Sequence, residues 1–289
     1  MTLANAFDAI TRKLSSLLCR PFRHCQIQDR SNTTLGYYLS AKMFISQEQK
    51  ASAARQLHIH RTLLWDDCEP SPLMPMICSV RSHTLGLSHV MWNTEQVEHI
   101  VHSNPDLKFY FNYQRRIMRA DLARYLILLK YGGAYFDLDI HMHRRITSFF
   151  EETKQDISVN MRDSQYCILF EEHRWKSTDE AVDQKEQPIR LFLEPEYQTE
   201  ALTRVANYAM ICTPEHPFMH RIIQVCKERS HLKATDDYDV LFITGPDVVS
   251  HIYHTATPSF LREHNVILIS LEEHNKFITH HHVGNWRTS

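Results

Sequence analysis

The sequence contains neither of the two glycine-rich loops that most often bind nucleotide phosphates. Its 289 residues include only 6 glycines, and no G-x-G-x-x-G or G-x-x-x-x-G-K-[ST] pattern occurs, so neither a dinucleotide site nor a P-loop is predicted. The 7 cysteines form no C-x-x-C pair, which argues against a zinc site built from thiolates. No apolar run approaches the roughly 18 residues that a transmembrane helix requires.

The charge balance excludes another large class of function. The formal net charge is -2, with 43% hydrophobic and 23% charged residues, so no global attraction to nucleic acid is expected. This composition is typical of a globular chain with a full core. The odd cysteine count fits reduced thiols, or one or two disulfides with a free cysteine in a lumenal protein, and leaves the compartment open.

What the sequence does contain is a pair of acids in an apolar segment, AYFDLDI at residues 134–140. An extended strand directs Tyr135, Asp137 and Asp139 to one face and the apolar residues to the other. Two carboxylates this close repel each other unless a cation lies between them. We therefore predict a divalent metal site, with Asp139 as a direct ligand and Asp137 in a shared role.

A helix is predicted directly before this segment, at residues 115–130. Apolar residues recur there at helical spacing, there is no internal glycine or proline, and Gly132 and Gly133 follow as a stop. Asp121 and Arg124 lie three residues apart and so share one face of the helix. The unit delivers this Asp/Arg pair and the two acids to neighbouring places.

The stretch RADLARYLILLKYGGAYFDLD, residues 119–139, resembles the sugar-binding region of DXD glycosyltransferases of the inositol phosphorylceramide mannosyltransferase type, in glycosyltransferase family 32. A bare D-x-D is common by chance, whereas the whole string is specific. Weaker similarity extends from about residue 56 to 286. It includes IHRT at 59–62, with Arg61 where glutamine is usual, an Asn207 segment, TGP at 244–246 and HVGNW at 282–286, with Asn285 where serine is usual.

The resemblance implies the GT-A fold, an α/β architecture with a mixed sheet flanked by helices. Strand signals at 56–61, 88–92, 134–140 and 266–269 agree with an α/β class on their own. In such folds, ligands lie beyond the carboxyl ends of the strands. The resemblance further implies a retaining transferase that uses Mn²⁺ or Mg²⁺ and takes a hexose from a nucleotide-sugar, GDP-mannose or a UDP-hexose, to a glycan or lipid acceptor.

The resemblance also assigns the expected site residues. Asp137 and Asp139 are the expected catalytic and metal-binding acids, and His282, the histidine best aligned among His280, His281 and His282, is a third candidate ligand. The expected donor-binding residues are Asp121, Arg124, Tyr135, Trp286, Thr62 and Trp92. His141 and His143 continue the parity of the two acids and are weaker candidates.

Outside the resemblance, residues 1–50 form an expected extension with an apolar stripe. A short packed helix, a membrane-surface helix and a targeting segment all fit that stripe. Residues 51–289 form the expected catalytic domain, with a polar insertion around 151–200. Many relatives act in the Golgi, so an endomembrane location, a peripheral membrane association and a cytoplasmic location all stay open.

Two other functions stay open on the sequence alone. A catalytically inactive relative would keep the fold and bind a nucleotide or a partner protein, which the unusual Arg61 and Leu63 allow. A two-metal phosphohydrolase would need further acidic or histidine ligands, for which only His141 and His143 are available nearby.

Overall fold

The computed structural model describes residues 57–65, 71–157, 165–177, 180–182, 190–193 and 202–283. The predicted N-terminal extension, residues 1–50, lies outside the described residues, as does Trp286. The N-terminal interpretations and the role expected for Trp286 therefore stay predictions.

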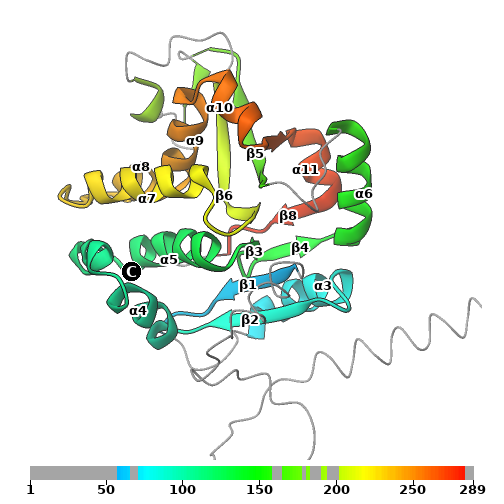
Figure 1. The fold of residues 1–289 in the computed structure, drawn as a ribbon, viewed down its shortest axis with the longest axis horizontal. Helices are drawn as coiled ribbons and strands as arrows, with labels where there is room; N and C mark the ends of the chain where they lie inside the picture. The colour runs from blue at the N-terminus through cyan, green and yellow to red at the C-terminus, as the bar shows by residue number, and fades with distance from the viewer. Residues whose placement is uncertain are drawn as a thin grey trace, which may run out of the picture.

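A six-stranded sheet in the order β2-β1-β3-β6-β5-β7 runs through the molecule (Figure 1). The strands are β1 (His58–Thr62), β2 (Ser88–Trp92), β3 (Gly133–Phe136), β5 (Cys167–Trp175), β6 (Leu202–Cys212) and β7 (Val266–Ile269). β1 is parallel to β2 and β3, and β5 is parallel to β7, whereas β6 is antiparallel to both β3 and β5. The carboxyl ends of all strands except β6 therefore meet at one edge.

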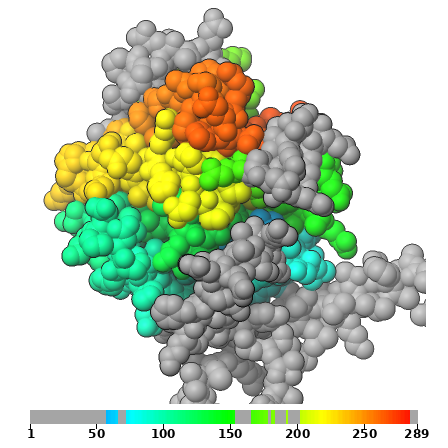
Figure 2. Space-filling model, viewed as in Figure 1, coloured from blue at the N-terminus to red at the C-terminus, as the bar shows by residue number. Residues whose placement is uncertain are grey.

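Helices cover both faces of the sheet, and this confirms the predicted α/β class with a mixed sheet. They are α3 (Met74–His83), α4 (Thr94–His102), α5 (Arg116–Tyr131), α6 (Ile146–Ile157), α7 (Pro217–Arg229), α8 (Asp237–Ile243), α9 (Pro246–Thr255), α10 (Pro258–Glu263) and α11 (Leu271–Phe277). Short 3-10 turns occupy Ser71–Leu73, Pro105–Asn112 and Arg190–Leu193. Seen from outside, α9 and α10 (orange) lie above α7 and β6 (yellow), with α4 (teal) below (Figure 2).

Alternation along the strands builds one hydrophobic core on each face. Tyr135 belongs to a core that α5, α7, α8 and α9 share, whereas its neighbours Ala134 and Phe136 belong to the core beneath α3, α6 and α11. This is the period of two expected for a strand buried on both faces. β3 is therefore packed between two cores, one on each face of the sheet.

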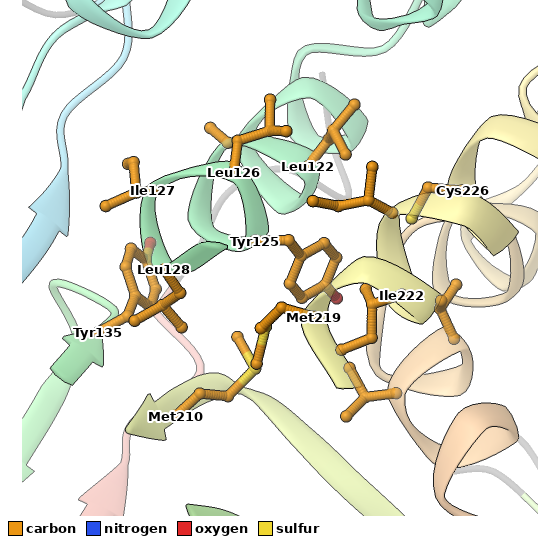
Figure 3. Close-up of a cluster of buried hydrophobic side chains, with 14 of the residues drawn as sticks. Leu122, Tyr125, Leu126, Ile127, Leu128, Tyr135, Met210, Met219, Ile222 and Cys226 are labelled. Carbon is orange, nitrogen blue, oxygen red and sulfur yellow. The ribbon is translucent and has the colours of Figure 1, made fainter. Parts of the chain in front are cut away.

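The predicted helix at 115–130 is confirmed as α5. Its apolar face packs on α7 and on Met210 of β6, with Tyr125, Met219 and Ile222 at the contact (Figure 3). Gly132 ends the helix at φ 63°, where its N–H donates to Leu128 O across 2.8 Å. A Cβ at Gly132 would lie 2.5 Å from Pro214 Cδ, so both the left-handed backbone and the space require glycine.

The single strand predicted at 134–140 is wrong, because the segment divides at the two acids. β3 ends at Phe136, Asp137 N–H donates to Tyr208 O at 2.8 Å, and Ile140 N–H donates back to Asp137 O at 3.3 Å. The chain then forms β4 (Ile140–Met142), which pairs with β8 (Ile278–His280) in a separate two-stranded sheet. Asp137 and Asp139 therefore lie in a turn, residues 137–139, rather than on the strand.

Other sequence-based boundaries are close. The strands predicted at 88–92 and 266–269 have these bounds in β2 and β7, whereas β1 starts two residues and ends one residue later than the prediction at 56–61. Within 151–200, where a polar insertion was predicted, Cys167–Trp175 forms β5 of the main sheet. If residues 151–200 contain an insertion, β5 is therefore not part of it.

Two further features bear on the open questions. Cys78 is disulfide-bonded, which removes the alternative that every cysteine is reduced, while Cys167, Cys212 and Cys226 are buried free thiols. Within the ranges that the structure describes, no helix has the length and apolar character needed to cross a bilayer.

Candidate active site

The turn at 137–139 lies at the edge where the parallel strands end (Figure 1). β6 is longer than β3 and continues past it, so that Asn207 and Tyr208 stand beside the turn. α5 packs on the face of the sheet to which Tyr135 belongs, and it places Asp121 and Arg124 close to the turn. This edge is where ligands bind in open α/β sheets.

Asp121 and Arg124 are buried charged residues of this site, and each is only 4% exposed. Arg124 NH2 lies 3.0 Å from Asp121 Oδ1, and the same oxygen accepts from Asn207 Nδ2 at 3.0 Å. The other oxygen of Asp121 accepts from Thr244 Oγ1 at 3.0 Å. Both oxygens therefore have partners, as a buried carboxylate requires.

Burial and neighbouring charges shift the pKa of both members of this pair. Burial raises the pKa of Asp121 from 3.8 to about 6, although Arg124 and Thr244 each pull it down. Burial alone would lower the pKa of Arg124, but the neighbouring Asp137, Tyr135 and Asp121 raise it above its ordinary value. Arg124 is thus a permanent cation beside a carboxyl group that ionises near neutral pH.

Arg124 also connects the helix to the turn. Its NH1 donates to Asp137 Oδ2 at 3.0 Å and to Asn207 O at 3.1 Å. The second oxygen, Asp137 Oδ1, accepts from the Tyr135 hydroxyl at 2.7 Å, and that hydroxyl lies 2.8 Å from Thr62 Oγ1. The carboxylate of Asp137 is therefore held by Arg124 of α5 and Tyr135 of β3, and Thr62 of β1 contacts it through the Tyr135 hydroxyl.

Asp139 is held by the C-terminal part of the described chain. Its Oδ1 lies 3.3 Å from His280 Nε2, and its Oδ2 accepts from Val283 N–H at 3.0 Å. Burial alone would raise the pKa of Asp139, but the hydrogen bonds from His280 and Val283 bring it below its ordinary value. Asp139 therefore stays ionised at neutral pH.

Ligand atoms of Asp137, Asp139 and His280 all lie within 4.8 Å of one another. Carboxylate oxygens suit Mg²⁺ and Mn²⁺, and an imidazole nitrogen is a common further ligand of transition metals. Among the described residues, the buried Nδ1 of His280 has no hydrogen-bond partner, whereas its Nε2 lies beside Asp139. The chemistry of this donor set fits a divalent cation.

Residues 70–156, which contain the helix pair and both acids, match the family described as a glycosyltransferase sugar-binding region containing a DXD motif. This stretch is similar to DXD-type glycosyltransferase sugar-binding regions. Over 60 residues the chain is 38% identical to inositol phosphoceramide mannosyltransferase 3 of Schizosaccharomyces pombe, a match that covers 20% of this chain and 17% of that protein's own length. The predicted resemblance to this type of glycosyltransferase is thereby confirmed.

Among solved structures, a PaToxG glycosyltransferase is similar, with a TM-score of 0.46 and 10% sequence identity. The similarity covers 75% of this chain and 79% of that chain.

The matched region, residues 70–156, does not contain the whole site. It supplies Asp121, Arg124, Tyr135, Asp137 and Asp139, whereas residues on both sides of it complete the contacts. The residues from outside, with their partners, are Thr62 on Tyr135, Asn207 and Thr244 on Asp121, and His280 on Asp139.

Trp92 and His282, two further sequence-predicted residues, lie outside the network of contacts around the two acids. Trp92 is 8% exposed and its Nε1 donates to His60 Nδ1 at 3.1 Å, so its indole is part of the core beside β1. His282 is exposed, and its ring centroid lies 4.0 Å from that of His280. His280, rather than His282, therefore has its ligand atom beside the two acids.

A second group of close donor atoms is part of the packing. Ligand atoms of Cys167, Cys212 and His216 also lie within 4.8 Å of one another. However, His216 Nδ1 accepts from Phe218 N–H at 3.1 Å, and Nε2 donates to His264 O at 2.7 Å. Because both ring nitrogens are used, a metal bound to either nitrogen would break one of these two hydrogen bonds.

Sequence reasoning did not foresee three contact residues: Arg61, Asn207 and Thr244. His280 was a candidate, but the sequence favoured His282 over it. Asn207 and Thr244 lie in segments that resemble the family, which was a usable signal, but no pattern showed that both contact Asp121. Arg61 was noted only as a departure from the usual glutamine. Its NH2 donates to the backbone oxygens of Asp137 and Leu138.

Proposed function

We propose that the protein is a metal-dependent, retaining glycosyltransferase that moves a hexose from a nucleotide-sugar to a hydroxyl group of a glycan or lipid. The observation that carries the proposal is the meeting of two groups at one strand edge. One group is the Asp137, Asp139 and His280 cluster, and the other is the Asp121–Arg124 pair, which contacts it through the bond from Arg124 to Asp137. A nucleotide-sugar needs both a cation site and polar groups for its sugar.

The proposed roles follow from the bonds that each side chain still has to offer. Asp139 is the direct metal ligand, and Asp137, already oriented by Arg124 and Tyr135, shares the metal and faces the sugar. A Mn²⁺ or Mg²⁺ ion bound there supplies electrostatic stabilisation of the negative charge that develops on the departing diphosphate. His280 is the third ligand supported by distance, and His282 remains the alternative on the neighbouring residue.

Asp121 and Arg124 are proposed to bind the donor sugar from the buried side of the site. A carboxylate accepts about four hydrogen bonds and a guanidinium donates five, so each keeps capacity beyond the partners described above. Arg124 directs fixed N–H groups at the edge where Asp137 lies, and Asp121 accepts from sugar hydroxyls. Tyr135 and Thr62 act on the donor through Asp137, because their hydroxyls bond to each other and to that carboxylate.

Retention of anomeric configuration, which the resemblance implies, has a consequence for the residues required. In that chemistry an oxygen of the departing phosphate takes the proton of the acceptor hydroxyl on the same face of the sugar. No positioned carboxylate base is then needed, and the acids are free to hold the cation.

GDP-mannose is the favoured donor because a curated relative is named as a mannosyltransferase that acts on inositol phosphoceramide. UDP-glucose and UDP-galactose are the alternatives. The same name favours a lipid among the acceptors, with a glycan as the other choice.

The proposal is tested by incubating the purified chain with a panel of nucleotide-sugars, with Mn²⁺, Mg²⁺ or a chelator, and measuring release of the nucleoside diphosphate. We expect hydrolysis of one donor only with metal, at least 100-fold slower in Asp139→Asn, and unchanged in the exposed control Asp106→Asn. Hydrolysis by Asp139→Asn at the wild-type rate would contradict the metal assignment. Calorimetry with GDP and UDP identifies the inactive binder, which would bind nucleotide tightly without turnover.

A further inference from the structure

Arg61, at the end of β1, contacts the turn that carries the two acids through its backbone. Its NH2 group donates to Asp137 O at 3.2 Å and to Leu138 O at 3.0 Å. The residue is only 3% exposed, and β1 lies directly beside β3 in parallel register. A guanidinium thus reaches two consecutive carbonyl groups from a neighbouring strand.

Neighbouring residues of β1 hold the same aspartate from opposite faces of the sheet. Side chains of Arg61 and Thr62 alternate in direction because they are consecutive in a strand. Thr62 bonds the Tyr135 hydroxyl, which donates to the Asp137 carboxylate, whereas Arg61 bonds the Asp137 carbonyl. One residue therefore acts on the side chain and the other on the backbone.

Backbone hydrogen bonds fix the main chain at the two ends of the turn. Asp137 N–H donates to Tyr208 O at 2.8 Å, Ile140 N–H to Asp137 O at 3.3 Å and His281 N–H to Asp139 O at 3.1 Å. These bonds fix both ends of the turn. The bond from Arg61 to Leu138 fixes its middle residue, which separates the two acids and sets the angle between their side chains.

We propose that Arg61 is a positioning residue that locks the turn at 137–139, so that Asp137 and Asp139 present their carboxylates to one cation. The inference rests on the proposed metal site. It assigns a role to the one residue of IHRT that departs from the family pattern, where glutamine is usual. Arginine suits this role because it stays charged and its N–H groups have a fixed planar geometry, while its long stem reaches the turn.

The test compares Arg61→Met, which removes every donor, with Arg61→Lys, which keeps the charge and a point donor. Arg119→Met is the matched control, because Arg119 also donates to two backbone oxygens, of Tyr113 at 2.9 Å and Phe111 at 3.5 Å, and lies on α5. The first measurement is hydrogen exchange of residues 137–142 in metal-free protein. The second is the dissociation constant for Mn²⁺, obtained from the EPR signal of the free ion.

We expect residues 137–142 to exchange at least 10-fold faster in Arg61→Met, while β6 at 205–212 exchanges as in the wild type. Mn²⁺ affinity should fall by about 10–100-fold, the usual effect of removing a group that orients metal ligands. Arg61→Lys should recover part of both, and Arg119→Met should change neither. If Arg61→Met does not fold, Arg61→Lys carries the test, with intermediate values expected for both.

Wild-type exchange and affinity in the folded Arg61 variants would overturn the inference and leave the metal site intact. If the wild-type chain itself binds no Mn²⁺, the proposed function fails. The exchange measurement still shows in that case whether Arg61 holds the turn, and unchanged exchange would overturn that as well.

Discussion

The carboxylate of Asp121 accepts a hydrogen bond from the hydroxyl of Thr244, which lies 3.0 Å away in space and 123 residues later in the chain. Thr244 begins the TGP turn between α8 and α9, and its backbone oxygen accepts from the Tyr125 hydroxyl at 2.8 Å. The turn is thus bonded to α5 through both Asp121 and Tyr125. This relationship ties the C-terminal half of the chain to the ionisation of the buried acid.

Removing that hydroxyl should shift the pH dependence of donor turnover. The hydrogen bond from Thr244 lowers the pKa of Asp121, which burial raises to about 6, so Thr244→Val should raise it further. We expect the acidic limb of kcat/KM for the donor to move up by about one pH unit, because a hydrogen bond to a charged group contributes roughly 1.5 kcal/mol. The control Thr255→Val removes an exposed hydroxyl that bonds His251 O. An unshifted limb in Thr244→Val would show that Asp121 is not the titrating group.

Asp121 should also shape the stability of the fold as pH changes. Its folded pKa of about 6 exceeds the ordinary 3.8, so the folded state holds an extra proton between these values. The resulting contribution to the free energy of unfolding is fully present below about pH 4, and is lost as pH rises through about 6, by roughly 3 kcal/mol in total. Urea titrations from pH 4 to 7 should show a smaller fall in the free energy of unfolding for Asp121→Asn than for the wild type. Equal slopes in the two proteins would argue against a raised pKa.

Arg124 should be the residue of this site whose loss costs most stability. It is the cation between Asp121 and Asp137, and removing one partner of a buried ion pair typically costs about 3–5 kcal/mol. Arg124→Met should lose that amount by urea denaturation at pH 7. The control Arg115→Met breaks the more exposed pair with Asp237 and should lose about 0–1 kcal/mol. A similar loss in both variants would mean that the Arg124 network is not a buried ion cluster in solution.

Two neighbouring histidines should differ in their effect on metal affinity. His280 Nε2 lies 3.3 Å from Asp139, whereas His282 is exposed and contacts the ring of His280. His280→Ala should weaken Mn²⁺ binding by about 10–100-fold, and His282→Ala by less than threefold, both measured by calorimetry. The reverse order would assign the metal to His282, as the sequence prediction had it.

The local part of the site could be predicted from sequence because its signals are local. Helical periodicity and the two glycines specify α5 and its end, and the spacing of Asp121 and Arg124 then follows from the helix. The break of the strand at Asp137 could not be predicted in the same way. The alternation in AYFDLDI suits a continuous strand, and the competing bond to Tyr208 O comes from a strand some 70 residues later.

The remaining contacts depend on tertiary structure that no local pattern encodes. Asn207 and Thr244 reach Asp121 only because β6 extends past β3 and α8 ends above α5. In the sequence, Arg61 is only a departure from the usual glutamine. Its proposed role depends on the strand order that places β1 beside β3. His280 and His282 differ by two positions, and the pairing of β8 with β4 decides which one faces Asp139.

The most direct test of the central claim is a crystal structure of the chain with Mn²⁺ and a nucleoside diphosphate, with anomalous diffraction used to locate the ion. The account predicts one manganese peak bonded to a carboxylate oxygen of Asp139, with Asp137 beside it and the diphosphate on its open side. A bound diphosphate with no manganese at these acids, or manganese bound elsewhere, would contradict it.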